Sequence, residues 1–218
     1  MKKEQHLKAL FSQRFVAFMI DLILVSFITS LVTAIIPTNS SIDKLYDQQV
    51  KIVENYTAGK ITMQKYVNQL VDINYDIAKQ TGIITLVSIA ISLLYYVLYV
   101  YKNDGQSIGK KMMKIKIQKK DKDKDKELTM NDLLFRTMIL QGTLVSIIGF
   151  CTILFLDKDT YLATNSLLNL IQYSILIISF FLIAFTKERQ GLHDMVAKTE
   201  VVCTNTVLNK EEEKLCEN

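Results

Sequence analysis

The stretch RFVAFMIDLIL places a carboxylate inside an apolar run, and it is the part of this chain most able to do chemistry. Arg14 begins the stretch and Asp21 lies seven residues later. Seven residues are nearly two helical turns, so both side chains project from one helix face, with Asp21 roughly 10 Å inside the run. A carboxylate at this depth must face protein or water rather than lipid. Two interpretations follow. The residues form a buried ion pair, or Asp21 is a proton or cation site whose pKa depends on the conformation of the protein.

Two other segments contain candidate partners for Asp21. Arg136 is expected at a similar depth in a later apolar run, and the sequence RQGLHD, with His193 and Asp194, follows the last run. A histidine can titrate near neutral pH, although GLHD can also be a turn that caps and docks the tail. The charges thus fit a transport site, or a structural network of Arg14, Asp21 and Arg136 that fixes the helix register.

Four apolar runs supply the elements that must position these side chains. They are residues 15–36, 82–101, 133–156 and 162–185. Each run is roughly 30–36 Å long as a helix, enough to cross a hydrocarbon core of about 30 Å. The first could instead belong to a cleaved signal peptide, but its length and its aspartate favour a retained span. We therefore predict an all-α membrane protein with four transmembrane helices and without a large soluble core.

The distribution of lysine predicts the orientation in the membrane. Segment 102–127 holds ten lysines against five acidic residues, whereas segment 37–81 holds five of each. Positive charge favours the cytoplasmic side. Both termini and the loop 102–132 are therefore expected in the cytoplasm, with 37–81 as the outer loop and 204–218 as a polar cytoplasmic tail.

The outer loop is expected to form a helical hairpin, because apolar residues recur at helical spacing on both sides of Gly59. Thr62 has the right type and position to cap the second helix. Such a hairpin is either a spacer packed on the membrane surface or a lid that docks a partner.

The cytoplasmic loop is expected to contain three elements. SIGKKMMKIK predicts a short interfacial helix, with its apolar face in lipid and its lysines near anionic headgroups. KIKIQ alternates as a strand does and could pair with ELTM or with TEVVCT, while KKDKDKDKE predicts an exposed turn. Thr129 and Asp132 form a predicted capping box that opens the third span.

Amide side chains also lie inside the apolar runs. Gln141, Asn169 and Gln172 would be costly in lipid, so we expect them to face one another or a wet cavity. The serine and threonine stripes of the spans are instead typical of helix packing.

Three motifs, in order, resemble the RDD family of bacterial multi-pass membrane proteins. The first is RFVAFMIDLIL. The second is DGQSIGKKMMKIKI, with Gly105, Ser107, Gly109 and Lys110. The third is RQGLHDMVAKTEVV, with Arg189, Gly191, Leu192, His193, Asp194 and Thr199.

The resemblance extends from about residue 10 to 203, although the outer loop and KKDKDKDKE look longer than usual for the family. It implies one transmembrane domain over 1–203 in a bacterial cell membrane, with Asp194 as the second aspartate. It also suggests transport of an unknown ligand, or sodium–proton exchange. Lys110, Arg189, His193 and Asp194 would then cluster at the cytoplasmic mouth.

Two function classes follow from these observations. One is a small transporter with proton coupling through Asp21; the other is a non-transporting assembly or accessory protein with structural charges. An enzyme is not expected, because no nucleophile–base pair or phosphate loop is apparent in the sequence. We predict no cofactor, metal or nucleic-acid partner. The expected partners are the lipid bilayer and, if the protein transports, a second copy or another membrane protein.

Overall fold

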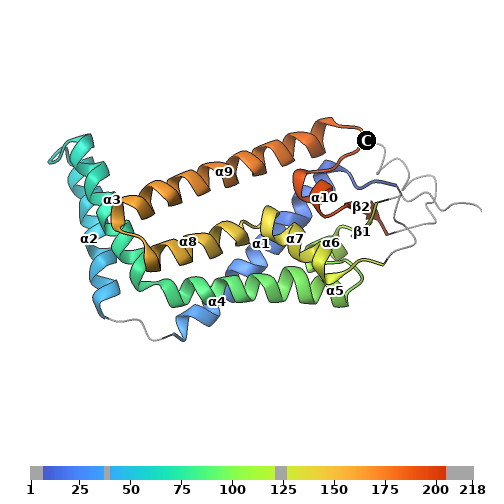
Figure 1. Cartoon of the computed structure of the whole chain (residues 1–218), viewed down its shortest axis with the longest axis horizontal. Coiled ribbons are helices and arrows are strands. Elements are labelled where there is room, and N and C mark those ends of the chain that lie inside the picture. Colours follow the sequence, from blue (N-terminus) through green and yellow to red (C-terminus); the bar gives the residue numbers. More distant parts are fainter. Residues whose placement is uncertain (1–6, 37–39, 121–126, 205–218) are drawn as a thin grey trace, which may run out of the picture.

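The computed structural model describes residues 7–36, 40–120 and 127–204 and is mostly helical (Figure 1). Its strands are β1 Ile115–Lys119 and β2 Thr199–Cys203. Its helices are α1 Phe11–Ala34, α2 Ser40–Thr57, α3 Met63–Gln80, α4 Gly82–Leu93, the π-helical η1 Leu94–Tyr99, α5 Val100–Lys102, α6 Ile108–Met112, α7 Met130–Leu140, α8 Thr143–Phe155, α9 Lys158–Phe185 and α10 Leu192–Val196.

The long helices run lengthwise between two different ends (Figure 1). The helices α2 and α3 cross one end, which we name the hairpin end. The two strands, α6 and α10 lie at the other, which we name the sheet end.

Three helical segments are long and apolar enough to cross a membrane. They are α1, the continuous Gly82–Lys102 helix formed by α4, η1 and α5, and α9. The pair α7 and α8 passes the same test jointly and would be a fourth, broken span. The sequence prediction of a membrane protein is therefore confirmed, with three spans or four.

The helix predicted over 133–156 is not continuous, because it is divided into α7 and α8, which are bent by 68°. Gly142 lies at the bend with a φ of 66°, a left-handed conformation that glycine adopts without a steric cost. A Cβ there would meet the Gln172 side chain at 3.1 Å. The Gln172 amide donates to the Ile139 carbonyl at 3.1 Å and so satisfies one of the α7 carbonyls near the break.

The last span also differs from its predicted bounds. Asp157 caps α9 by accepting the Thr160 N–H at 3.1 Å, so most of the predicted loop 157–161 is the first turn of this helix. The side chain of Lys158 forms an ion pair with Asp72 of α3, which ties the start of α9 to the hairpin.

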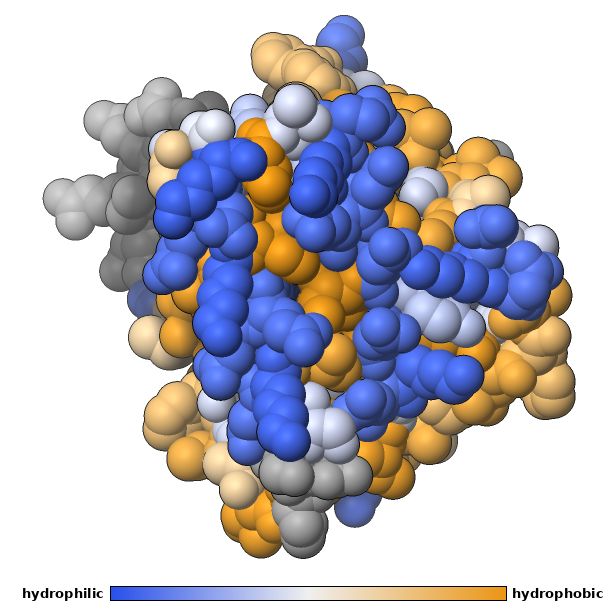
Figure 2. Space-filling view, turned by 90° about the vertical axis from the view of Figure 1, so that its left-hand side faces the viewer, coloured by the Kyte–Doolittle hydropathy of each residue, from blue (hydrophilic) through white to orange (hydrophobic). Residues whose placement is uncertain are grey.

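The predicted helical hairpin is present. Thr62 caps α3 as expected, accepting the Lys65 N–H at 3.4 Å. The rings of Tyr56 and Tyr66 stack at 4.3 Å across the two helices. Figure 2 faces this end, and hydrophilic side chains cover much of it. The hairpin therefore has the surface of a water-facing cap.

Within the described residues, the best-buried apolar side chains gather at the sheet end. Strand β1 pairs antiparallel with β2, with Ile117 opposite Val201, so TEVVCT and not ELTM supplies the second strand. The segment before α1 extends this sheet, since Ala9 N–H donates to the Val201 carbonyl at 3.0 Å. Ile115 of β1 and Leu133 of α7 are fully buried in one apolar core cluster.

The loop between β1 and α7 is described in part. The predicted turn KKDKDKDKE falls largely on residues 121–126, outside the described residues. The capping box of Thr129 and Asp132 is confirmed, and Lys119 Nζ donates to Asp132 at 2.6 Å.

The predicted interfacial helix is present as α6, but its placement differs. It packs against α1, where a Cβ on Gly109 would lie 2.2 Å from the Ala17 carbonyl oxygen. Ile115, expected in lipid, is fully buried, and Lys110 is turned inwards with 16% of its side chain exposed. The lipid-facing orientation is therefore wrong for Ile115, whereas Met112 on the same predicted face is 65% exposed. Gly109 lets α6 dock on the bundle.

Candidate functional site

Asp194 is the centre of a buried charge cluster at the sheet end. Its carboxylate accepts hydrogen bonds from Arg14 Nη2 on α1 and Arg136 Nη1 on α7, and its side chain has no exposed surface. It also accepts the Gly191 N–H at 3.0 Å, which caps α10. One carboxylate thus joins three elements that are far apart in the sequence.

The two arginines keep Asp194 ionised. Burial alone would raise the pKa of Asp194, but Arg136 and Arg14 outweigh it and hold this pKa well below its ordinary range. The neighbouring His193 responds differently, because burial lowers its pKa to about 3 although Asp194 attracts the charged form. The prediction that His193 titrates near neutral pH is therefore wrong, and its imidazole is neutral.

Further contacts fix both guanidinium groups. Arg136 Nη1 donates to Thr199 Oγ1 at 3.0 Å, where β2 begins. Arg14 Nη1 donates to the carbonyl of Arg189, whose φ of 48° is uncommon for a residue with a side chain. The arginines therefore connect α1 and α7 to the chain segment that follows α9.

Asp21 forms a second, separate cluster. Both arginines contact Asp194, so the expectation that Arg136 is the direct partner of Asp21 is wrong. The segment after α9 folds back between α1 and α7 and takes both guanidinium groups. Asp21 is nonetheless shielded as the sequence requires, with 1% of its surface exposed.

The Asp21 carboxylate is held mainly by neutral donors. It accepts hydrogen bonds from the Tyr95 hydroxyl at 2.6 Å, from the Gly109 N–H at 2.8 Å and from the Ser107 hydroxyl. Tyr95 in turn accepts the Ile108 N–H at 3.1 Å. The first turn of α6 is thereby fixed onto the side of α1.

Lys110 is the cation of this second cluster. Its Nζ lies 3.8 Å from Asp21 Oδ2 and donates to Ser107 Oγ at 3.2 Å. Burial lowers the pKa of Lys110 to about 8, although Asp21 raises it, and Arg136 and Arg14 lower it further. The two clusters are therefore electrostatically coupled, and Lys110 can lose its proton near pH 8.

The remaining glycines of the motifs serve close packing at the same end. A Cβ on Gly105 would lie 2.2 Å from the Ile117 carbonyl oxygen, and one on Gly191 would lie 2.6 Å from His193 Cε1. These two positions leave no room for a side chain. The second and third motifs thus supply glycines that allow close packing, as well as charged side chains.

A cavity of about 250 Å³ adjoins both clusters. Residues of α1, α7 and α9 contribute to its wall, and much of the wall is apolar. The charged and titratable residues that line it include Arg14, Asp21, Lys110, Arg136 and His193. The structure therefore brings most of the predicted charge-network residues to one hollow.

The three predicted amides are distributed differently. Gln172 contacts the bend, Asn169 donates to the Asn165 carbonyl of its own helix at 2.8 Å, and Gln141 lines the cavity. Each amide thus has its own environment, so the alternative that all three face one another is wrong. A second hollow of about 290 Å³, lined by Gln141, Thr143 and hydroxyl residues of α4 and α8, lies at the bend.

Tyr95 is a member of the site that the sequence prediction missed. Its role depends on η1, whose wider π-helical turn changes the register of the second span. Gln190 was missed too: its amide donates to the Thr199 carbonyl at 2.9 Å and accepts Lys120 Nζ at 2.7 Å. An aromatic hydroxyl roughly four turns into an apolar helix was the available signal for Tyr95.

Comparison with known proteins gives one family. Residues 8–198 match the RDD family, a range that contains the first two motifs, the third motif as far as Lys198, and both Asp21 and Asp194. No curated protein and no solved structure matches the chain.

Proposed function

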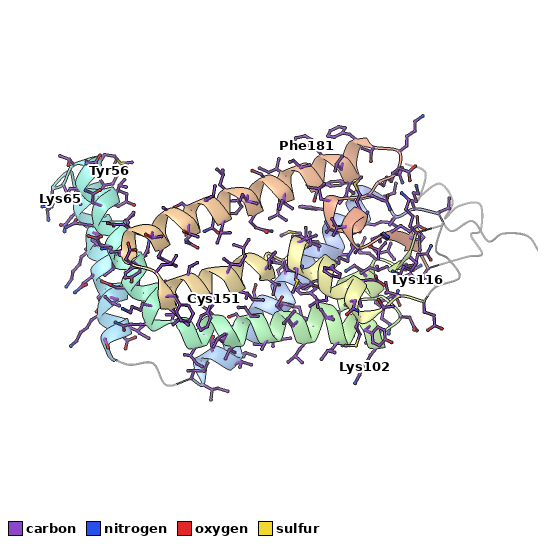
Figure 3. The ribbon with its side chains drawn as sticks, viewed as in Figure 1. Tyr56, Lys65, Lys102, Lys116, Cys151 and Phe181 are labelled. Atoms are coloured by element: carbon purple, nitrogen blue, oxygen red, sulfur yellow. The ribbon has the colours of Figure 1, made fainter. Side chains whose placement is uncertain are left out.

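This chain belongs to the RDD family, and on that premise we propose that it is a small multi-pass transporter of a bacterial cell membrane. Three or four membrane-crossing segments support its place in the bilayer. The proposed orientation has the termini and the sheet end in the cytoplasm. Lys102 and Lys116 lie at that end, which supports the orientation through the preference of lysine for the cytoplasmic side (Figure 3).

The observation that carries the proposal is the Asp21 carboxylate at the wall of the cavity. A buried carboxylate that borders a hollow at membrane depth is typical of ion and proton pathways. Asp21 shares this wall with Lys110, whose pKa is lowered to about 8 by burial. Loss of the Lys110 proton would leave Asp21 without its cationic neighbour, so proton release and cation entry are coupled in the proposed cycle.

Flux measurements in proteoliposomes test this proposal. With a pH-sensitive dye inside and an imposed sodium or potassium gradient, the wild-type protein is expected to change the internal pH. Asp21→Asn should reduce that rate at least tenfold, because it removes the charge that binds the proton or the cation. Asp76→Asn, which changes an exposed aspartate of α3, is the matched control. Unchanged flux through a correctly inserted Asp21→Asn protein would contradict the proposal.

A second candidate is an assembly or accessory protein in which the charges are structural. It is favoured by the saturation of Asp21, which already accepts three hydrogen bonds and lies beside an ammonium group. This candidate predicts that Asp21→Asn lowers the Tm and that a partner membrane protein co-purifies. Cation-dependent proton flux by the purified protein alone would rule it out.

A further inference from the structure

The cavity beside the two clusters has two unlike walls. Part of its lining is aromatic and aliphatic, and part is basic. The apolar part includes Phe11, Phe15, Phe18, Leu176 and Phe180, while the basic part is Arg14, Lys110 and Arg136. A ligand that fills this space needs an apolar body and a polar head of suitable charge.

The charge of the basic part selects the sign of that head. Three cations, Arg14, Arg136 and Lys110, face two carboxylates, since Asp194 serves both arginines and Asp21 lies near the lysine. A buried site with an excess of one cation favours an anion, because an unbalanced charge away from water is costly. The head is therefore expected to carry a single negative charge.

Hydrogen-bonding capacity is also left in the site. Within the described residues, Arg136 donates its hydrogen bonds through Nη1, so Nη2 and Nε keep donors for a ligand. His193 also lines the cavity, is 2% exposed, and has an Nδ1 atom without a hydrogen-bond partner in the described part of the chain. A buried nitrogen of this kind ordinarily has a partner, which a bound head group or water would supply.

The cavity reaches the surface that faces lipid. Phe15 and Phe180 both line it, yet they are 46% and 44% exposed on α1 and α9. The rings of Phe11 and Phe180 meet at 4.6 Å across the two helices. A molecule in the bilayer can therefore enter sideways between α1 and α9 when these rings move apart.

We propose that this cavity binds a singly anionic amphiphile from the membrane, with its head at Arg136 and Lys110 and its chain among the phenylalanines. The head group belongs either to a free fatty acid or to an anionic phospholipid, because both present one negative charge on an apolar body. The proposal rests on the proposed function only in placing the ligand at the same cavity, and it adds a membrane ligand to the proton and the cation.

The absence of tryptophan from this chain allows a direct test. Phe180→Trp places a single fluorophore at the cavity, and Phe181→Trp places one on the neighbouring side chain, which points away from the bundle (Figure 3). Leu176→Trp, one turn earlier on the cavity wall, is a second reporter in case the larger ring at position 180 blocks entry. Each variant is placed in nanodiscs of unbrominated zwitterionic lipid.

Three brominated quenchers distinguish the sources of the ligand. They are dibrominated stearate, a brominated phosphatidylglycerol and a brominated phosphatidylcholine. The fluorescence of Phe180→Trp or of Leu176→Trp should be quenched saturably by one or both anionic probes, at about tenfold lower mole fraction than by the zwitterionic probe. The fluorescence of Phe181→Trp should respond to all three alike, as a residue in bulk lipid does. Quenching by stearate alone identifies a fatty acid, and quenching by phosphatidylglycerol alone identifies a phospholipid.

Charge variants complete the test. Lys110→Gln in the reporter background should weaken the anionic quenching about tenfold, whereas Lys111→Gln, at an exposed position, should leave it unchanged. Equal quenching by anionic and zwitterionic probes in both cavity reporters, Phe180→Trp and Leu176→Trp, would overturn the proposal. Selective quenching without proton flux would support the ligand site and contradict the transport function. Proton flux without selective quenching would support the transport function and contradict the ligand site.

Discussion

Asp194 and Asp21 are both buried carboxylates at the sheet end, but their surroundings are opposite in kind. Asp194 is held by two guanidinium groups, whereas Asp21 is held by two hydroxyls and a backbone N–H with one ammonium at 3.8 Å. The arginines remain charged at any ordinary pH, but the lysine does not. The first carboxylate therefore suits a permanent joint, and the second suits a site whose charge can change.

The largest effect that would test this contrast is expected from Asp194→Asn. It leaves the Arg14 and Arg136 charges buried together without a counter-charge, which should destabilise the fold by about 3–5 kcal/mol. The measurement is the Tm of the detergent-purified protein, together with its yield in the membrane fraction. Asp76→Asn is the control, and a Tm close to that of the wild type would show that Asp194 is not a joint.

A smaller loss of stability is expected from Tyr95→Phe. This change removes a hydrogen-bond donor to Asp21 and the acceptor of the Ile108 N–H. A hydrogen bond to a charged group contributes about 1.5–3 kcal/mol, so the Tm should fall less than in Asp194→Asn. Tyr99→Phe is the matched control, because the Tyr99 ring stacks on Tyr95 at 5.4 Å and its hydroxyl has no hydrogen bond within the described residues. Equal Tm values for the two variants would mean that the Tyr95 hydroxyl does not hold Asp21.

The smallest effect is a change in the pH dependence of stability. The pKa of Lys110 is lowered from 10.5 to about 8 in the folded protein, so the unfolded chain binds more protons between these values. Stability should therefore rise with pH from about 8 to about 10.5 in the wild type, and Lys110→Gln should remove that part of the rise. Tm values across this range measure it, with Lys111→Gln as the control. The charged groups that shift the pKa of Lys110 are Asp21, Arg136, Arg14 and Asp194. If Tm rises with pH as steeply in Lys110→Gln as in the wild type, another group causes the rise.

Local patterns in the sequence predicted the elements well, because local rules govern them. The caps at Thr62 and Thr129 and the strand KIKIQ depend on neighbours within a few residues. The break at Gly142 was not predicted, since glycine inside an apolar run is common and its left-handed φ depends on packing against α9. The π-helical turn at Tyr95 is hidden for a similar reason, because a change of register leaves the composition unchanged.

Which residues belong to the charge network was easier to predict than which of them contact one another. The sequence placed Arg14, Asp21, Arg136 and Asp194 together because charges at membrane depth must find each other. It did not determine which carboxylate takes the arginines, since that depends on how the segment after α9 folds back. Depth along a helix is a local property, whereas the partner is decided by tertiary structure.

The contacts of Asp194 with Arg14 and Arg136 also affect the order in which parts of the protein fold during synthesis. Arg14 leaves the ribosome 180 residues before Asp194, and the strand that pairs with residues 7–9 is made later still. Until the segment after α9 emerges, the guanidinium groups of Arg14 and Arg136 lack the Asp194 carboxylate as counter-ion. The sheet end is therefore expected to form late in biogenesis, when the segment after α9 packs against the much earlier α1.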